Sequence, residues 1–138
     1  MAERCPSYTS LGPALLEGYE LAFTRRSRRS GTGVADIVPA PGSVVWGVLY
    51  EVDDACLESL DRKEGRGWAY ERVTVPVTLE ADGSVHEAQS YSVVTRESEP
   101  VAPSAAYLDG LISAAETAEL PDAYVTTLRA FKDAAAFR

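Results

Sequence analysis

The sequence predicts an α+β domain in which most strands come first and most helices come last. Three observations support this prediction. Strand-like apolar patterns recur between residues 19 and 94, and apolar residues follow at helical spacing after residue 104. A third is a short amphipathic stretch, residues 53–64, inserted between strands. A doubly wound sheet would instead alternate strands and helices throughout. With 138 residues, we expect a single domain, residues 1–138, with one real core.

The composition indicates a globular, acidic protein. Apolar residues make up 46% of the chain and the formal net charge is −8. Nucleic acids and anionic membranes call for a net basic surface, so neither is an expected partner. No window approaches the roughly 18 apolar residues of a membrane span, and the N-terminus lacks the apolar core of a signal peptide. A cytoplasmic location is therefore expected.

Cysteine and histidine are too sparse for a metal or disulfide framework. Cys5 and Cys56 are far apart in the chain, and His86 is the single histidine. We expect two reduced thiols, with Cys56 as a small core residue. His86 begins an alternating strand beside a turn, which favours surface exposure over metal ligation.

The N-terminal quarter is predicted to contain one strand between irregular segments. Residues 1–13 include two prolines and a glycine and suggest an irregular entry. Residues 19–24 alternate apolar and polar side chains, the pattern of a half-buried strand. The run from Arg25 to Arg29 holds four arginines in five positions. Serine and glycine surround them, which favours a mobile solvated loop over an anion-binding patch.

The middle of the chain is predicted to contain two strands. Residues 34–38 suggest a short strand that stops at the prolines and glycine of residues 39–42. Residues 44–50 form a near-continuous apolar run, typical of a strand covered on both faces. Gly47 is its only gap, and a glycine there lets a ligand or another backbone come close.

A short helix is expected next. Asp53 or Asp54 can cap its start, and apolar residues at positions 56, 57 and 60 give it one apolar face. Its acidic residues, Asp61 among them, are interpreted as a solvated face. Gly65 occupies the position of a left-handed C-terminal residue, so Glu64 should lie at the helix end.

A hairpin and two helices complete the prediction. Residues 71–79 alternate as a strand, and Pro76 makes it an edge strand or a bulged one. A turn leads into a returning strand over residues 85–94. Ser104 is a plausible cap for the next helix, and Pro121 can open the last one.

The residues alone give no catalytic motif. Phosphate-loop, nucleophile-elbow and metal-ligand spacings are missing from the sequence. On local pattern, Glu64 is an ordinary exposed carboxylate, slightly unfavourable at a helix C-terminus. Tyr107 lies on the apolar stripe of its helix, which favours a core ring with a satisfied hydroxyl.

Several segments together resemble the gamma-glutamylcyclotransferase-like family. They are GVADIVPAPGSVVWGVLYEV, LDRKEG with Tyr70 close behind, and QSY followed by PSAAY. The resemblance runs from about Cys5 to Leu128. It implies a small mixed β-barrel with flanking helices, and it implies no cofactor and no metal.

The resemblance also implies a reaction and a site. Family enzymes release 5-oxoproline and a free amine from a small gamma-glutamyl amide, because the substrate's α-amine attacks its own γ-carbonyl. The family's catalytic glutamate falls on Glu64, and its substrate-pocket tyrosines fall on Tyr70, Tyr91 and Tyr107. Gly47 is the expected point of close backbone approach. A carboxylate suits this chemistry, since the attacking amine must lose a proton and the departing nitrogen must gain one.

One family feature is missing from the sequence. The family carries a Tyr-Gly-Ser-Asn loop after its first strand, and the loop's N–H groups stabilise the oxyanion. The 138 residues contain no such motif. Either the start was assigned at an internal methionine, or the chain is a short form without the first strand. A short form would expose a sheet edge open to homo-oligomer pairing, and it would lose about 3–4 kcal/mol of transition-state stabilisation per missing donor.

Two other functions stay open at this stage. The first is a catalytically impaired binding module that recognises an amino-acid-like ligand or a partner strand. The second is a tailoring enzyme that removes a gamma-glutamyl group from a larger amine, with Arg25 to Arg29 at the mouth of its pocket. The sequence does not identify the amine that is released.

Overall fold

The strands and helices follow the order expected of an α+β domain. A computed structural model describes residues 8–27, 32–64 and 69–136. The elements are β1 (Tyr8–Arg26), β2 (Gly33–Val52), α1 (Asp54–Glu64), β3 (Tyr70–Leu79), β4 (Val85–Val93), α2 (Ala105–Thr117) and α3 (Asp122–Ala136). The α+β prediction is therefore confirmed, including the one helix between strands.

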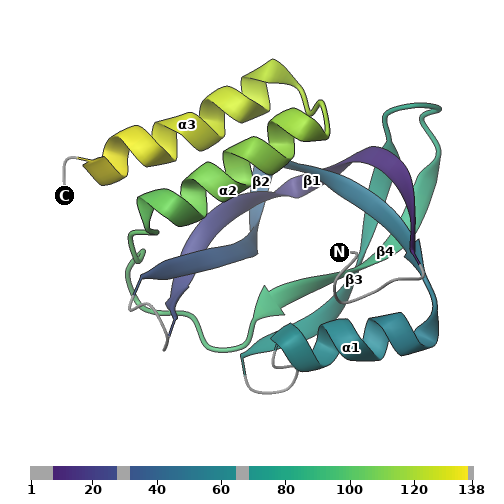
Figure 1. The fold of residues 1–138 in the computed structure, drawn as a ribbon, viewed down its shortest axis with the longest axis horizontal. Helices are drawn as coiled ribbons and strands as arrows, with labels where there is room; N and C mark the ends of the chain where they lie inside the picture. The colour runs from purple at the N-terminus through teal and green to yellow at the C-terminus, as the bar shows by residue number, and fades with distance from the viewer. Residues whose placement is uncertain (1–7, 28–31, 65–68, 137–138) are drawn as a thin grey trace.

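The sheet consists of two antiparallel hairpins that meet over a short stretch. Its strand order is β2-β1-β3-β4, and each neighbouring pair is antiparallel. Within the described residues, the ladder between the hairpins consists of two residue pairs, Ala14 with Leu79 and Leu15 with Thr78. Figure 1 shows the second hairpin set at an angle to the first. The resemblance implied a small mixed β-barrel. In the part of the chain that the structure describes, the sheet is antiparallel and open, with β2 and β4 as its edges.

Strand β1 begins earlier than the sequence suggested. It starts at Tyr8, so the prediction of an irregular entry is wrong for residues 8–13, while residues 1–7 lie outside the described part. The register shifts between Ser10 and Gly12, and Gly12 has a φ of 99°. This irregularity absorbs the turn-forming residues without ending the strand.

Strand β1 also ends later than predicted. Arg25 and Arg26 belong to it and pair with Val34 and Gly33 of β2, so the predicted solvated loop is wrong for these two arginines. Arg28 and Arg29 lie outside the described residues.

Strand β2 runs through the prolines that were expected to stop it. It is continuous over Gly33–Val52, so the predicted break at residues 39–42 is wrong. Its pairing with the described part of β1 skips residues 40–43, because the register shifts between Glu17 and Tyr19. Pro41 lies in this skipped stretch, whereas Pro39 pairs with Tyr19. Both prolines are tolerated because β2 is an edge strand.

The predicted helix starts are confirmed. The Asp53 Oδ1 atom accepts a hydrogen bond of 2.8 Å from the Cys56 N–H at the start of α1. The Ser104 Oγ atom accepts one of 3.1 Å from the Tyr107 N–H at the start of α2. Helix α1 ends at Glu64, as expected from the glycine that follows.

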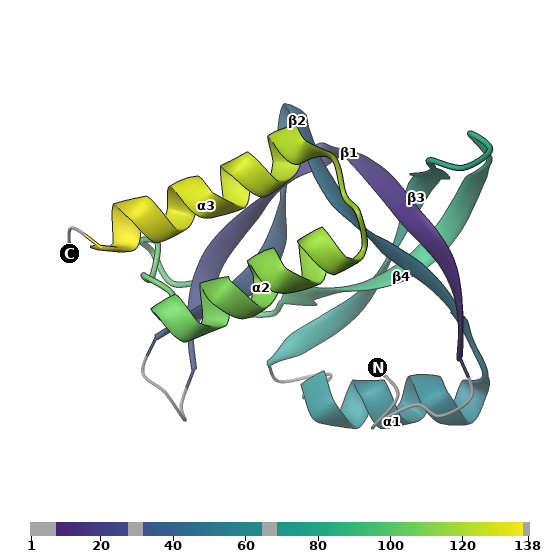
Figure 2. The same ribbon diagram turned by 45° about the horizontal axis from the view of Figure 1, so that its top comes forward.

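Two apolar clusters hold the fold together. One joins β1 to β3, and the other joins α2 and α3 to each other and to β1 and β2 through Leu21 and Trp46. Figure 2 shows α2 and α3 side by side over the first hairpin, while α1 lies apart from them near the ends of β3 and β4. Helix α1 is therefore positioned by a different part of the sheet. The buried members of the first cluster are Ala14, Leu16, Val75, Val77 and Leu79, and those of the second are Ile112, Ala115, Leu120, Val125 and Leu128.

Cys56 anchors the buried side of α1. Its side chain is 5% exposed, as expected for a core residue. It is disulfide-bonded, so the prediction of a reduced thiol is wrong for Cys56. Cys5 lies outside the described residues.

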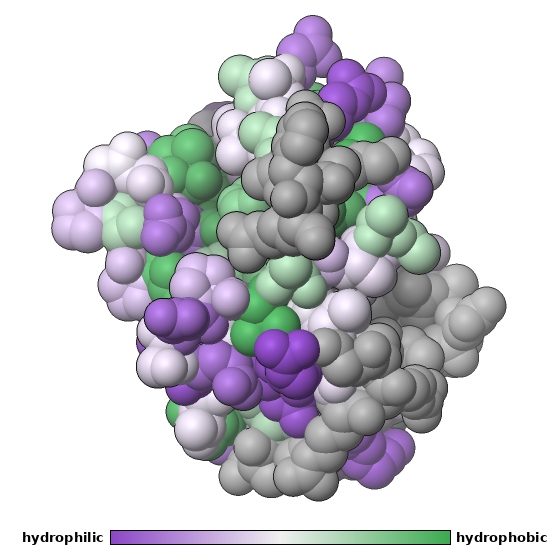
Figure 3. Space-filling model, turned by 90° about the vertical axis from the view of Figure 1, so that its left-hand side faces the viewer, coloured by the Kyte–Doolittle hydropathy of each residue, from purple (hydrophilic) through white to green (hydrophobic). Residues whose placement is uncertain are grey.

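The described surface is mixed in character. On the side shown in Figure 3, hydrophobic residues form small patches between hydrophilic ones. Among residues 8–27, 32–64 and 69–136, no helix has the length and apolar character needed to cross a bilayer.

Candidate functional site

A cavity of about 570 Å³ lies between the two hairpins and α1. Its wall includes the inner faces of β2 and β3, one flank of β4, and the apolar face of α1. Gly47, where close approach was predicted, is part of this wall. A Cβ atom added to Gly47 would have no other atom within 4 Å. The strand therefore borders open space at this position. Other wall residues are Leu49, Leu57, Leu60, Val75, Val77 and Tyr91.

Glu64 is the last residue of α1. The helix that carries it is fixed at its start by the Asp53 cap and along its length by the burial of Cys56. Leu57 and Leu60 of the same helix reach the cavity wall. The side chain of Glu64 lies outside the described part, so its catalytic role stays a prediction.

Tyr70 and Tyr107 meet on the backbone of Ala35. The Tyr70 hydroxyl donates a hydrogen bond of 3.0 Å to the Ala35 carbonyl oxygen. The Tyr107 hydroxyl accepts one of 3.0 Å from the Ala35 N–H. The Tyr107 ring also packs edge-on against Phe23, with ring centroids 6.3 Å apart. These two tyrosines are therefore brought together from β3 and α2, but they lie beyond the described wall of the cavity.

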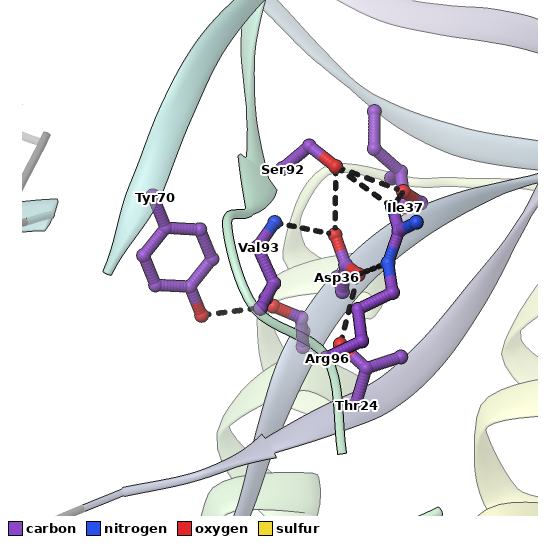
Figure 4. Close-up of polar contacts among 8 residues, drawn as sticks. Thr24, Asp36, Ile37, Tyr70, Ser92, Val93 and Arg96 are labelled. Atoms are coloured by element: carbon purple, nitrogen blue, oxygen red, sulfur yellow. Dashed lines mark hydrogen bonds and ion pairs between the residues drawn. The ribbon is translucent and has the colours of Figure 1, made fainter. Parts of the chain in front are cut away.

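Beside Ala35 is a dense polar group that we call the Asp36 cluster: Thr24, Asp36, Ser92, Val93 and Arg96. The Asp36 carboxylate accepts hydrogen bonds from Thr24 Oγ1 at 2.8 Å, the Val93 N–H at 2.9 Å, Ser92 Oγ at 3.2 Å and Arg96 Nε at 2.7 Å. Figure 4 shows these partners converging on Asp36 from β1, β4 and the segment after β4. The Asp36 side chain is fully buried, whereas that of Arg96 is 40% exposed.

The Asp36 cluster brings the two sheet edges together. Asp36 belongs to β2, while Ser92 and Val93 belong to β4, the opposite edge of the sheet. A buried carboxylate with this many donors is stable only because each of its lone pairs is used. The open sheet is thus closed at this end by side-chain hydrogen bonds in place of a strand ladder.

A second polar group, the Asp61 cluster, consists of Asp61, Arg72 and Tyr91. The Tyr91 hydroxyl donates a hydrogen bond of 2.6 Å to Asp61 Oδ1, and Arg72 Nε lies 3.5 Å from the same oxygen. The side chain of Asp61 is 12% exposed and that of Arg72 is 20% exposed. Arg72 and Tyr91 lie opposite each other on β3 and β4. This cluster ties the C-terminal half of α1 to the second hairpin.

The Asp61 cluster corrects one prediction. The prediction of a solvated helix face is wrong for Asp61, whose side chain is largely buried and accepts the Tyr91 hydroxyl hydrogen bond. Arg72 and Asp36 are not among the site residues that the sequence predicts. The only sequence signal for Asp36 was a carboxylate within an otherwise apolar strand segment, a pattern that requires buried partners.

Other titratable groups contribute little to a site. His86 is half-buried, and its Nε2 lies 2.8 Å from Ser84 Oγ. Hydrogen bonds from Ser84 lower the pKa of Asp82 in the neighbouring turn. Burial raises the pKa of Tyr124 on α3. Across the described ranges, His, Cys, Asp and Glu side chains form no group of three that could hold a metal ion.

Comparison with known proteins gives consistent results. The AIG2-like family matches residues 44–128. The gamma-glutamylcyclotransferases of mouse and human are 30% and 31% identical to this chain, each over 134 residues that cover 94% of this chain and 70% of theirs. The bovine protein of the same name is 32% identical over 105 residues, covering 72% of this chain and 55% of its own.

Solved structures agree with these relatives. A gamma-glutamyl cyclotransferase structure has a TM-score of 0.85 and 28% identity, covering 94% of this chain and 78% of that one. YkqA from Bacillus subtilis has a TM-score of 0.78 and 26% identity, covering 90% of this chain and 44% of that one. The fold of the described residues is thus similar to that of these proteins.

Proposed function

Because this chain belongs to the AIG2-like family and has gamma-glutamylcyclotransferases among its relatives, we propose that it is a gamma-glutamyl cyclotransferase. The observation that carries the proposal is the position of Glu64. It follows Leu60, a wall residue of the cavity, by four positions, and that spacing places two residues on the same face of a helix. The end of α1 then lies on the helix face that reaches a cavity large enough for a small substrate.

The proposed reaction is an intramolecular aminolysis. Glu64 takes a proton from the substrate's α-ammonium group, and the resulting amine attacks the γ-carbonyl carbon. A carbon–nitrogen bond forms in the five-membered ring, and the amide bond to the leaving nitrogen breaks. Glu64 returns this proton to the leaving nitrogen as the amide bond breaks. The ring nitrogen still carries one surplus proton from the original ammonium group; Glu64 takes it and passes it to the departing amine. The products are therefore 5-oxoproline and an ammonium ion, with no net change in protons on the enzyme.

The cavity supports this chemistry by holding one folded substrate conformation. Ring closure joins two ends of the same molecule, so much of the acceleration can come from orientation. Gly47 permits close backbone approach on one side, and Tyr91 closes the cavity near α1. The hydroxyls of Tyr70 and Tyr107 are hydrogen-bonded to the backbone of Ala35, and neither residue is part of the described cavity wall. Of the three predicted tyrosines, we therefore assign Tyr91 to direct substrate contact.

The direct test is the release of 5-oxoproline and amine from a panel of gamma-glutamyl amides. We expect turnover by the unaltered protein and a loss of about 100-fold or more in Glu64→Gln, the usual effect of removing a general acid–base. Glu58→Gln is the matched control, because Glu58 is an exposed carboxylate on the same helix. Equal activity in both variants would overturn the assignment of Glu64. The isomeric α-glutamyl amides should release no amine.

A binding module is the second candidate. It is favoured by one observation, that these 138 residues contain no Tyr-Gly-Ser-Asn motif to supply oxyanion donors. A thermal-shift series with 5-oxoproline and gamma-glutamyl amides separates the two, since ligands that bind the folded state raise the unfolding temperature. Stabilisation without any amine release would support the module.

A further inference from the structure

The side chain of Arg72 is 20% exposed, but it contains a buried hydrogen-bond donor that is unused. Among the described residues its Nε atom is inaccessible to solvent and makes no hydrogen bond. Buried donors of this kind are uncommon, and a charged one calls for an explanation. A ligand that supplies the missing acceptor is one such explanation.

The geometry of the Asp61 cluster explains why the donor is unused. Asp61 Oδ1 already accepts the Tyr91 hydroxyl at 2.6 Å and lies 3.5 Å from Arg72 Nε. Charge-assisted N–H···O bonds are normally about 2.7–2.9 Å long. Asp61 therefore offsets part of the charge of Arg72 without completing its hydrogen bonding.

The position of Arg72 connects it to the cavity. It lies directly opposite Tyr91 in the β3–β4 pairing, and Tyr91 is part of the cavity wall. Asp61 comes immediately after Leu60, another wall residue. Arg72 thus lies next to the wall at Tyr91, without being one of the described wall residues.

We propose that Arg72 binds the α-carboxylate of the gamma-glutamyl group. This inference rests on the proposed cyclotransferase function. The α-carboxylate is the one anion that every gamma-glutamyl amide and the 5-oxoproline product share. A guanidinium is suited to it because its planar fork donates two parallel hydrogen bonds to a carboxylate. In a chain with a net charge of −8, an anionic substrate requires such a local cation.

Binding at Arg72 would also orient the reaction. The α-carboxylate and the attacking α-amine sit on the same carbon, so a fixed carboxylate restricts where the amine can point. Arg72 would then contribute to affinity and to the folded conformation that ring closure needs.

The test compares 5-oxoproline with its uncharged amide, 5-oxoprolinamide, by calorimetry. We expect the unaltered protein to bind the acid at least about tenfold more tightly, as charge-assisted bidentate pairs typically allow. Arg72→Gln should bring this ratio close to one and raise KM for gamma-glutamyl amides more than it lowers kcat. Arg62→Gln is the matched control, because Arg62 is an exposed arginine on α1, next to Asp61.

The outcomes separate this inference from the function on which it rests. Turnover with an unchanged acid-to-amide ratio in folded Arg72→Gln would overturn the role of Arg72 and leave the cyclotransferase standing. Neither binding nor turnover by the unaltered protein would overturn both. If Arg72→Gln fails to fold, Arg72→Lys is measured in its place, because lysine keeps the positive charge but lacks the two parallel donors of the guanidinium. An unchanged ratio of acid to amide affinity in Arg72→Lys would also contradict the proposal.

Discussion

The Asp36 and Asp61 clusters contain the same kinds of side chain but differ in how fully these are hydrogen-bonded. Each joins a carboxylate to an arginine and a hydroxyl across separate elements. In the Asp36 cluster, Arg96 Nε lies 2.7 Å from its carboxylate and the remaining acceptor sites are also used. In the Asp61 cluster, the arginine lies 3.5 Å away and keeps an unused donor.

This difference indicates a stabilising role for the Asp36 cluster and a ligand-binding role for the Asp61 cluster. A fully hydrogen-bonded buried group stabilises one conformation and has nothing left to offer a ligand. An incomplete group costs stability, and it still has a donor to offer a ligand. We therefore expect changes in the Asp36 cluster to alter the free energy of unfolding, and changes in the Asp61 cluster to alter ligand affinity.

The largest effect is expected for Asp36→Ala. The change leaves the buried Val93 N–H and Ser92 without their acceptor and Arg96 without its counter-ion. We expect the free energy of unfolding in urea to fall by about 3 kcal/mol, the low end for a broken buried pair, because Arg96 keeps contact with water.

The matched control for that prediction is Glu116→Ala. It breaks the ion pair between Glu116 and Arg129, whose side chains are 53% and 56% exposed. Exposed pairs of this kind contribute less than about 1 kcal/mol. Similar losses in both variants would remove the distinction between the Asp36 cluster and an ordinary surface pair.

A smaller effect, on binding, is expected for Tyr91→Phe. Without the hydroxyl, Asp61 is released from its 2.6 Å bond and can approach Arg72 more closely. Arg72 would then be better paired inside the protein and less available to a carboxylate. We expect affinity for 5-oxoproline to fall severalfold, with a change in unfolding free energy below about 1.5 kcal/mol. Unchanged affinity would show that Tyr91 does not keep Arg72 available.

An effect of about 1 kcal/mol on stability is expected for Tyr107→Phe, since one neutral hydrogen bond, to the Ala35 N–H, is lost. Tyr70→Phe should cost a similar amount through the Ala35 carbonyl. Chemical denaturation of both variants measures the two losses. No loss in either would mean that these hydroxyls do not support the strand that carries Asp36.

The smallest effect concerns pH and lies outside both clusters. Burial raises the pKa of Tyr124 above its ordinary value of 10.0. Its contribution to stability is therefore complete below about pH 10 and is lost as the pH rises through the folded-state pKa, because the unfolded chain loses the proton first. Tyr124→Phe should flatten the alkaline decline of the unfolding temperature. A slope equal to that of Tyr8→Phe, a change at an exposed ring, would contradict this.

Much of the fold could be predicted because its signals are local. The cap at Asp53, the end of α1 at Glu64 and the cap at Ser104 each depend on residues within one helical turn. The early start of β1 and the continuity of β2 were missed for the opposite reason. Pairing between these long strands overrides local proline and glycine signals, and register shifts absorb the irregular residues.

The candidate site could be predicted only in part. The segments that resemble the family pointed to Glu64 and the three tyrosines, but not to their partners. Asp36 and Arg96 are 60 positions apart, and Asp61 and Tyr91 are 30 apart, so no spacing rule connects them. The buried state of Asp61 and the disulfide of Cys56 likewise depend on tertiary packing.

The most direct test is a side-by-side assay of Glu64→Gln and Asp36→Asn, below the unfolding temperature of both. Our account predicts that Glu64→Gln loses about 100-fold or more of its 5-oxoproline release while its unfolding midpoint stays unchanged. Asp36→Asn should keep its turnover per folded molecule while its midpoint falls. Full release of 5-oxoproline by Glu64→Gln would contradict the account.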